Sequence, residues 1–403
     1  MAPRMKTRVE DLAIFGGTPA FQEPLHVVRP NIGNRERLLK RINDMLNRRW
    51  FSNNGPYVQE FEQRLAEYTH VKHAIAITNA TIAQEIAVRA AGITGEVIIP
   101  SFTFIATAHA LQWQEIRPVF CDVDPGTHHI DPNRLEDMIT PRTTAIIGVH
   151  VWGAPCPIDD LTEIANRRGL HLMFDAAHAI GCSYRGKMIG GFGEAEIVSF
   201  HATKFLNSFE GGAVLTNDDA LANRVRYMRN FGFAGVDQVD YVGTNGKMTE
   251  VAAAMGLTSL ESIDEIIAVN KANYHAYQVG LARIPGINLF TYDEAERNNF
   301  QYIIVEVDES EAGISRDLLV KILHAENVLA RRYFYPGCHQ MEPYRSYYPH
   351  AGLLLPETEK LTQRVMSLPT GTAVDADTII KVCGIIRLAF ILSKQIKSEL
   401  DKE

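Results

Sequence analysis

Residues 170–204 read LHLMFDAAHAIGCSYRGKMIGGFGEAEIVSFHATK. The stretch begins with a short apolar run at 170–174, and Asp175 follows it directly. A second apolar run lies at 197–200, and Lys204 comes shortly after it. Short apolar runs bounded by glycine-rich or polar turns are typical of buried strands. The stretch therefore predicts two strands, each with a polar side chain of distinctive chemistry just beyond its end.

The same pattern repeats on both sides of this stretch. Further apolar runs that predict strands lie at 73–78, 96–100, 118–123, 144–150 and 212–216, and helical spacing appears at 34–49, 58–68, 83–91 and 158–168. Short apolar strands alternating with helices predict an α/β fold, with a mostly parallel sheet covered by helices on both faces. Ligands of such sheets bind beyond the carboxyl ends of the strands, so we expect the functional residues in the loops there.

The pattern changes near residue 250. We expect one long helix over 249–281, and then a strand at 300–307 and helices at 316–326 and 377–392. These elements predict a smaller α+β domain. The predicted organisation is an N-terminal arm at 1–30, a large domain at 31–270 and a small C-terminal domain at 271–403.

Composition excludes several classes of protein. The 403 residues are 46% hydrophobic and 22% charged, with a formal net charge of −8 and no basic stripe, so we expect no nucleic-acid partner. Five scattered cysteines without CxxC spacing argue against a disulfide framework and a zinc site, and we expect no metal. The sequence has no signal-peptide pattern and no apolar run long enough for a membrane span. We therefore expect a cytoplasmic protein without membrane contacts.

Asp175 and Lys204 are the strongest candidates for chemistry. A carboxylate at the mouth of a buried strand is costly without a cationic or hydrogen-bonding partner. The protonated pyridine nitrogen of pyridoxal phosphate would be such a partner, and the pairing makes the ring an electron sink. A partly desolvated lysine favours the neutral amine that a Schiff base requires. Taken alone, Asp175 is better explained as the cap of a following helix, and Lys204 as a surface lysine.

Other strand ends carry weaker signals. Ala80 and Thr81 lie between a strand and a helix, where free amide groups bind phosphate, although most such sequences are plain helix caps. Ser199 could also serve a phosphate, or only a turn. Phe104 could stack on an aromatic ring or pack in the core. His178 would lie one helical turn beyond Asp175 if a helix began there, beside the cofactor or in a purely structural role. The combination of these residues along one sheet is what favours a cofactor site.

The sequence resembles the DegT-type sugar aminotransferases, pyridoxal-phosphate enzymes of fold type I that aminate keto sugars carried on nucleotides. The resemblance covers about residues 12 to 370. It is carried by FGGTP (15–19), NNGP (53–56), PSFTF (100–104), DVD (122–124), VHVWG (149–153), DAAH (175–178), SFHATK (199–204), EGGA (210–213) and TNGKM (244–248).

The resemblance implies a role for each matching residue. Lys204 is the lysine that forms a Schiff base with pyridoxal phosphate, Asp175 pairs with its ring nitrogen, and His178 lies near its hydroxyl. Phe104 stacks on the ring, and the phosphate is bound by Ala80, Thr81 and Ser199. Asn245 reaches the cofactor of the neighbouring subunit, which implies a homodimer with shared active sites. His339 lies near the substrate.

Three positions depart from the family pattern. Ala80 replaces the glycine of an Asn-Gly-Thr turn, Phe209 replaces the first glycine of Gly-Glu-Gly-Gly, and Lys247 replaces an arginine. These changes bear on the substrate more than on the lysine chemistry. Relatives with histidine at the lysine position are dehydratases, so Lys204 favours transamination.

The stretches FLNSFEGG (205–212) and NVLARRYFYP (327–336) look most like the 4-aminotransferases of dTDP-4-keto-6-deoxyglucose, in the deoxysugar pathways of natural-product glycosides. We therefore expect L-glutamate to donate an amino group to the 4-keto carbon of such a sugar. Two alternatives on the same fold are a 3-keto-sugar aminotransferase and a sugar dehydratase. A third, of another class, is a regulatory protein that binds the cofactor or sugar without turnover.

Overall fold

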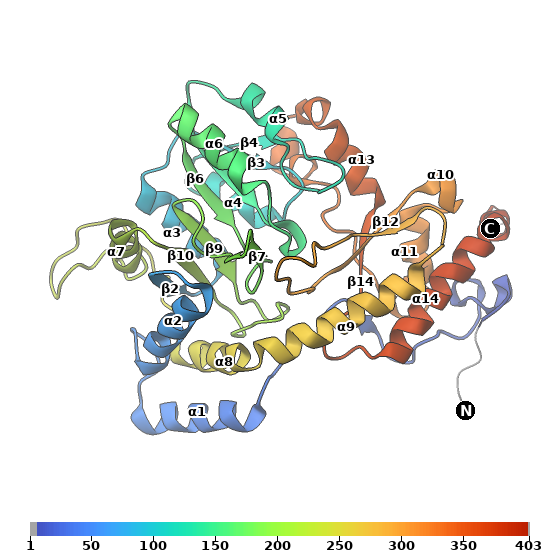
Figure 1. The fold of residues 1–403 in the computed structure, drawn as a ribbon, viewed down its shortest axis with the longest axis horizontal. Coiled ribbons are helices and arrows are strands. Elements are labelled where there is room, and N and C mark those ends of the chain that lie inside the picture. The colour runs from blue at the N-terminus through green and yellow to red at the C-terminus, as the bar shows by residue number, and fades with distance from the viewer. Residues whose placement is uncertain (1–5, 402–403) are drawn as a thin grey trace.

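The computed structural model describes residues 6–401 and shows two packed regions joined by long helices (Figure 1). Residues 1–5 of the predicted arm and residues 402–403 of the predicted C-terminal domain lie outside the described residues. Within the described residues, no helix is long and apolar enough to cross a membrane.

The larger region is built on a seven-stranded sheet, as the apolar runs predict. In spatial order its strands are β2 (His73–Ile77), β10 (Gly212–Thr216), β9 (Ala195–Ser199), β6 (His171–Asp175), β5 (Thr143–Val149), β3 (Glu96–Pro100) and β4 (Arg117–Cys121). All pairings in this sheet are parallel except those of β10, which runs antiparallel to both of its neighbours. The predicted fold class, an α/β fold with a mostly parallel sheet, is therefore confirmed. The carboxyl ends of β2, β3, β6 and β9 therefore point to the same edge of the sheet.

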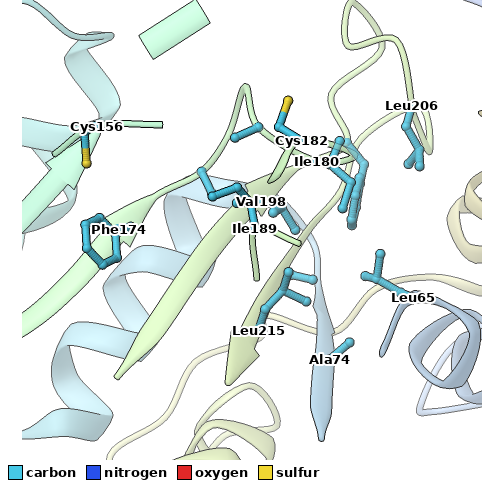
Figure 2. Packing of buried hydrophobic residues seen from close by; sticks show 14 of the residues in the cluster. Leu65, Ala74, Cys156, Phe174, Ile180, Cys182, Ile189, Val198, Leu206 and Leu215 are labelled. Atoms are coloured by element: carbon cyan, nitrogen blue, oxygen red, sulfur yellow. The ribbon is translucent and has the colours of Figure 1, made fainter. Parts of the chain in front are cut away.

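Alternate side chains of these strands enter two different cores. On β6, Leu172 and Phe174 pack with α2 and α6 on one face, whereas Met173 packs with α3, α4 and α7 on the other. Figure 2 shows the first of these cores, with Phe174 and Leu215 of the sheet and Leu65 of α2. Strands buried on both faces explain why the runs are continuously apolar rather than alternating.

The helices cover both faces and continue into the smaller region. They are α1 (Arg35–Arg48), α2 (Pro56–Thr69), α3 (Ala80–Ala91), α4 (Ile105–Gln112), α5 (Pro132–Leu135), α6 (Ile158–Arg168), α7 (Asp219–Met228), α8 (Glu250–Glu261), α9 (Ile263–Leu281), α10 (Glu309–Ala312), α11 (Arg316–Ala325), α12 (Tyr344–Tyr347), α13 (Pro356–Arg364), α14 (Ala376–Ile391) and α15 (Ser393–Leu400). Short 3₁₀ segments are η1 (Val9–Asp11), η2 (Ala13–Phe15), η3 (Glu136–Met138), η4 (Val151–Gly153), η5 (Cys338–Gln340) and η6 (Ala351–Leu354).

The long helix expected over 249–281 is interrupted, which corrects the prediction. α8 ends at Glu261 and α9 begins at Ile263, with Ser262 between them at φ −108° and ψ 8°. The Ser262 hydroxyl donates to the carbonyl oxygen of Thr258 at 3.4 Å. Back-bonding of this kind by serine bends helices. The two helices run along one side of the molecule and connect its two regions (Figure 1).

The smaller region has its own antiparallel sheet, formed by β11 (Ile287–Leu289), β12 (Ile303–Val307) and β14 (Val365–Leu368). Its core combines residues of α9, α11 and α14 with Val9 and Leu12 from the N-terminal segment. That segment is also held by β1 (Leu25–His26), which pairs in parallel with β13 (Val328–Leu329). A small hairpin joins β7 (Ser183–Tyr184) and β8 (Lys187–Met188). The domain boundaries at residues 30 and 270 stay a prediction.

Candidate active site

A cavity of about 660 Å³ opens at the edge of the large sheet where β2, β6 and β9 end. Seven of the residues singled out from the sequence line it: Ala80, Thr81, Phe104, Asp175, His178, Ser199 and Lys204. Asn245 and His339 are not among its lining residues. The cavity also receives side chains from the smaller region, among them Tyr302, Arg331, Tyr333 and Phe334.

Lys204 extends its amine into this cavity from the loop after β9. The Nζ atom donates a hydrogen bond to Tyr302 Oη at 3.1 Å and lies 5.7 Å from the centre of the Tyr302 ring. Burial lowers the pKa of Lys204 to about 8, although the nearby Tyr333 and Asp175 oppose the shift. A buried amine of this kind is neutral far more often than a surface lysine, so it can act as a nucleophile or a base.

Asp175 ends β6 and its carboxylate is held from two sides. Its Oδ2 accepts from Thr107 Oγ1 at 2.7 Å, and its Oδ1 accepts from the backbone N–H of Ala177 at 3.1 Å. The hydroxyl of Thr107 in turn lies 3.0 Å from that of Thr103, which extends the network to the loop before α4. Only 9% of Asp175 is exposed, so the carboxylate presents one restricted face to the cavity.

The amino end of α3 forms another wall of the cavity. Asn79 caps the helix by accepting from the N–H of Ile82 at 2.9 Å. The first amides of a helix have no intrahelical partner, so those of Ala80 and Thr81 are available to an anion. Gly212 at the start of β10 packs against them: a Cβ there would lie 2.5 Å from the Ala80 nitrogen. The missing side chain is therefore what lets β10 and α3 approach so closely.

Phe104 and Ser199 complete the part of the wall that was expected from the sequence. Phe104 precedes α4 and is 55% exposed, an unusual exposure for a large apolar ring. Its place in the cavity lining suits the ring to cover a flat ligand. Ser199 is buried at the end of β9, and its Oγ accepts from the N–H of His201 at 3.4 Å.

His178 reaches the cavity by a different route from the one expected. No helix follows Asp175; instead the chain makes a turn in which the Ala179 N–H donates to the Ala176 carbonyl at 2.9 Å. The expectation that Asp175 caps a helix, with His178 one turn on, is therefore wrong. The ring of His178 is buried and lies against Tyr302, with their centroids 4.6 Å apart.

Asn245 and His339 lie away from the cavity of their own chain. Asn245 is exposed, and its Oδ1 accepts from Lys247 Nζ at 2.7 Å. His339 is 2% exposed, with Nδ1 at 2.7 Å from Ser101 Oγ and Nε2 at 2.9 Å from Glu359 Oε1. Both ring nitrogens of His339 are thus occupied within the protein. His339 thus joins the loop at Ser101 to α13, and the expected place of His339 near the substrate stays a prediction.

Sequence reasoning missed the contribution of the smaller region. Tyr302 precedes β12, and Tyr333 and Phe334 lie after β13, far along the chain from the strand ends of the large sheet. The aromatic residues of the stretch 331–336 were noted only as a family likeness, without a role. Thr107, which holds Asp175, carries no signal of its own in the sequence, because a threonine early in a helix is ordinary.

The residues present fit pyridoxal phosphate. A buried amine, a hydrogen-bonded carboxylate, an exposed aromatic ring and unpaired helix amides are the groups that its aldehyde, pyridine nitrogen, ring face and phosphate require. The close approach of Gly212 to Ala80 shapes the cradle for the phosphate. On an α/β sheet of this topology, these groups define the class of protein as a pyridoxal-phosphate-dependent enzyme of fold type I.

Comparison with known proteins identifies the family. A model of the DegT/DnrJ/EryC1/StrS aminotransferase family matches residues 33–387, and the chain belongs to that family. It is 34% identical over 367 residues to the dTDP-4-amino-4,6-dideoxy-D-glucose transaminase of Shigella dysenteriae, covering 91% of this chain and 99% of that protein. It is 37% identical over 327 residues to the GDP-perosamine synthase of Caulobacter vibrioides, covering 79% and 86%.

Solved structures agree with this assignment. DesI, determined in the presence of its TDP-sugar product, is 49% identical with a TM-score of 0.94, covering 98% of this chain and 100% of that chain. DesV of S. venezuelae is 31% identical with a TM-score of 0.82, covering 89% and 98%. The protein is therefore a pyridoxal-phosphate-dependent sugar aminotransferase.

Proposed function

We propose that the protein transfers an amino group from L-glutamate to the 4-keto carbon of a nucleotide-linked 4-keto-6-deoxy sugar, with dTDP-4-keto-6-deoxyglucose as the substrate. The names of the relatives support this choice, since those of the Shigella dysenteriae enzyme and of DesI point to dTDP- and TDP-linked sugars. The observation that carries the chemistry is the Lys204 amine, which lies in one cavity with Asp175 and has its pKa lowered by burial to about 8.

The residues predicted from the sequence that line the cavity have distinct tasks in this proposal. When bound, pyridoxal phosphate supplies an electron sink for the carbon that loses its proton. Lys204 would hold the cofactor through its aldehyde carbon, and its free amine would carry the transferred proton on Nζ. Asp175 would keep the ring nitrogen protonated, and the hydrogen bond from Thr107 holds the Asp175 carboxylate in place for this role. The amides of Ala80 and Thr81, with Ser199, hold the phosphate, and Phe104 covers the ring.

The position of Arg331 supports the proposal that the substrates are anionic. Its guanidinium lines the cavity and lies 4.8 Å from the centre of the Tyr333 ring, and within residues 6–401 it has no carboxylate in ion-pair distance. The adjacent Arg332 is different, because it pairs with Asp317 at 3.4 Å outside the cavity. Glutamate and a sugar diphosphate both carry negative oxygens that Arg331 could bind in the two halves of a ping-pong reaction.

The proposed assembly is a homodimer with shared sites, in which Asn245 serves the cavity of the neighbouring subunit. Asn245 is exposed and outside its own cavity, as that arrangement requires. The proposed compartment is the cytoplasm, which suits the five unpaired, buried cysteines.

Product analysis tests the proposal. The purified enzyme with its cofactor is incubated with L-glutamate and dTDP-4-keto-6-deoxyglucose, and the product is identified by mass spectrometry and NMR. We expect an amino group at C4 and release of 2-oxoglutarate, and Lys204→Ala should abolish both. An amino group at C3, or loss of a hydroxyl, would replace the proposal with the 3-keto or the dehydratase alternative. Glutamate-independent binding without any conversion would favour the regulatory one.

A further inference from the structure

A chain of hydrogen bonds runs from the catalytic cavity through the protein to a second, outer cavity. Trp152 Nε1 lies 3.1 Å from His128 Nδ1, and His128 Nε2 lies 2.9 Å from Glu306 Oε1. Trp152 and His128 are fully buried, whereas the Glu306 side chain is 28% exposed and lines a cavity of about 630 Å³ beside β11 and β12. None of these three residues has a part in the chemistry described above.

The direction of each hydrogen bond in this chain is fixed by chemistry. An indole N–H can only donate, so His128 Nδ1 must accept from Trp152. The proton of the neutral His128 ring is then on Nε2, which donates to the Glu306 carboxylate. Trp152 and Glu306 together therefore fix the tautomer of His128, and His128 holds the orientation of the Trp152 indole.

The backbone of Trp152 extends the chain to His178. Trp152 has φ 65° and ψ 0°, a left-handed conformation that is strained for a bulky residue and needs support from its surroundings. In this conformation its backbone N–H donates to His178 Nδ1 at 3.3 Å. Its ring stacks on Phe334 with an interplanar angle of 5° and lies parallel to His178 at 15°. The hydrogen bond to His128 and the stacked rings together hold this conformation.

His178 is consequently restricted to one form. Because Nδ1 accepts from an amide, the ring proton is on Nε2. Burial and the positive charge of Lys204 lower the pKa of His178 well below its usual value, so the ring is neutral. No hydrogen bond within the described residues engages Nε2, although His178 lines the catalytic cavity. The Nε2–H group is therefore a donor that awaits an acceptor in the cavity.

We propose that Glu306, His128 and Trp152 form a positioning relay that holds His178 as a neutral Nε2–H donor toward the ring oxygen of the bound cofactor. The inference rests on the placement of the cofactor beside His178 proposed above. It adds three positioning residues and assigns His178 as a hydrogen-bond donor rather than a base. Asp175 and the relay then act on different atoms of the cofactor ring.

The first test reads the tautomer in the apoenzyme, where it does not depend on the cofactor. Histidines are labelled with ¹⁵N, and the His178 signals are assigned by their loss in His178→Gln. We expect Nδ1 unprotonated and Nε2 protonated in the parent, and a mixture of the two tautomers in His128→Phe. A protonated Nδ1 in the parent, or an unchanged His178 signal in His128→Phe, would overturn the relay.

The second test compares the affinity of the apoenzyme for pyridoxal phosphate. His128→Phe removes the two hydrogen bonds that His128 makes, whereas the glutamine of His128→Gln can accept from Trp152 and donate to Glu306. If His178 then loses its hydrogen bond to the cofactor, the dissociation constant of pyridoxal phosphate should rise on the order of fivefold to tenfold in His128→Phe. His128→Gln should restore most of the parent affinity. Equal losses in the two variants would contradict a hydrogen-bonded relay.

His171→Phe is the matched control, because His171 also pairs with a glutamate, Glu194, at 2.7 Å but lies at the opposite end of β6. It should leave the cofactor affinity unchanged. If His128→Phe does not fold, Glu306→Ala breaks the relay at its exposed end and should raise the dissociation constant in the same direction. Parent affinity in Glu306→Ala, with a folded protein by circular dichroism, would overturn the proposal.

Discussion

At the scale of a single residue, the depressed pKa of Lys204 gives the clearest prediction. A lysine that titrates near pH 8 rather than 10.5 is neutral roughly 300-fold more often at pH 7. Only the neutral amine attacks an aldehyde. The rate constant for capture of pyridoxal phosphate by the apoenzyme should therefore rise about fivefold from pH 7 to pH 8 and level off above about pH 9. Stopped-flow absorbance between pH 7 and 10 measures this profile.

The lowered pKa of Lys204 also makes the stability of the folded apoenzyme depend on pH. The folded state holds the Lys204 proton less tightly than the unfolded chain, so this group disfavours the folded apoenzyme below about pH 8 and ceases to do so as the pH rises toward 10.5.

Lys204→Arg, which keeps a charge but cannot capture the aldehyde, shows how much of the absorbance signal in the capture experiment belongs to Lys204. A capture rate that kept rising up to pH 10 would mean that Lys204 titrates as an ordinary lysine.

The functional residues at the strand ends could be predicted from the sequence, but the hydrogen bonds and turns that hold their side chains in place could not. Asp175 and Lys204 follow apolar runs, so their approach to one sheet edge was predictable. The hydrogen bond from Thr107 to Asp175 depends on how α4 lies against β6, which no local pattern encodes. His178 shows the same limit: its residue type is plain in the sequence, but no local pattern distinguishes the turn that places it from the start of a helix.

At the scale of an element, the junction between α3 and β10 is the point to test. In Gly212→Ala the new Cβ would meet backbone atoms of Ala80 at 2.5 and 2.7 Å, and a backbone contact of this kind cannot be relieved by rotating a side chain. The amino end of α3 must then move away from the cavity. We expect the dissociation constant of pyridoxal phosphate to rise by about tenfold or more, because the phosphate loses amide hydrogen bonds.

Pyridoxal, which lacks the phosphate, separates this local effect from general damage. Its affinity for Gly212→Ala should fall much less than that of pyridoxal phosphate. Gly126→Ala is the matched control, since a Cβ there meets only the Asp124 Oδ1 atom at 3.4 Å. Equal losses for the two ligands would show that α3 is not the phosphate site.

The elements of the large sheet were predictable because each strand is buried on both faces and is therefore apolar throughout. The direction of β10 was not, since a short run such as 212–216 reads the same in both directions. The break at Ser262 was missed because serine is common within helices, and its bending effect depends on the hydrogen bond to Thr258.

At the scale of the whole molecule, the cavity is assembled from distant parts of the chain. The large sheet provides Lys204 and Asp175, whereas Tyr302, Tyr333 and Phe334 come from the smaller region. Such pairing cannot be inferred from one sequence, because it depends on how two separately formed cores pack together. The proposed dimer extends this principle to a second chain through Asn245, which its own cavity does not use.

Mixing two inactive variants tests the shared site. If Asn245 serves the partner's cavity, a dimer of a Lys204→Ala chain and an Asn245→Ala chain contains one cavity with both native residues. Random exchange of subunits should then restore about a quarter of the parent activity from two nearly inactive preparations. Lys204→Ala mixed with Asp175→Ala is the control, because both residues line the cavity of their own chain and no intact cavity can form. No recovery in the first mixture, although Asn245→Ala is inactive, would place Asn245 in its own chain's site or outside any site.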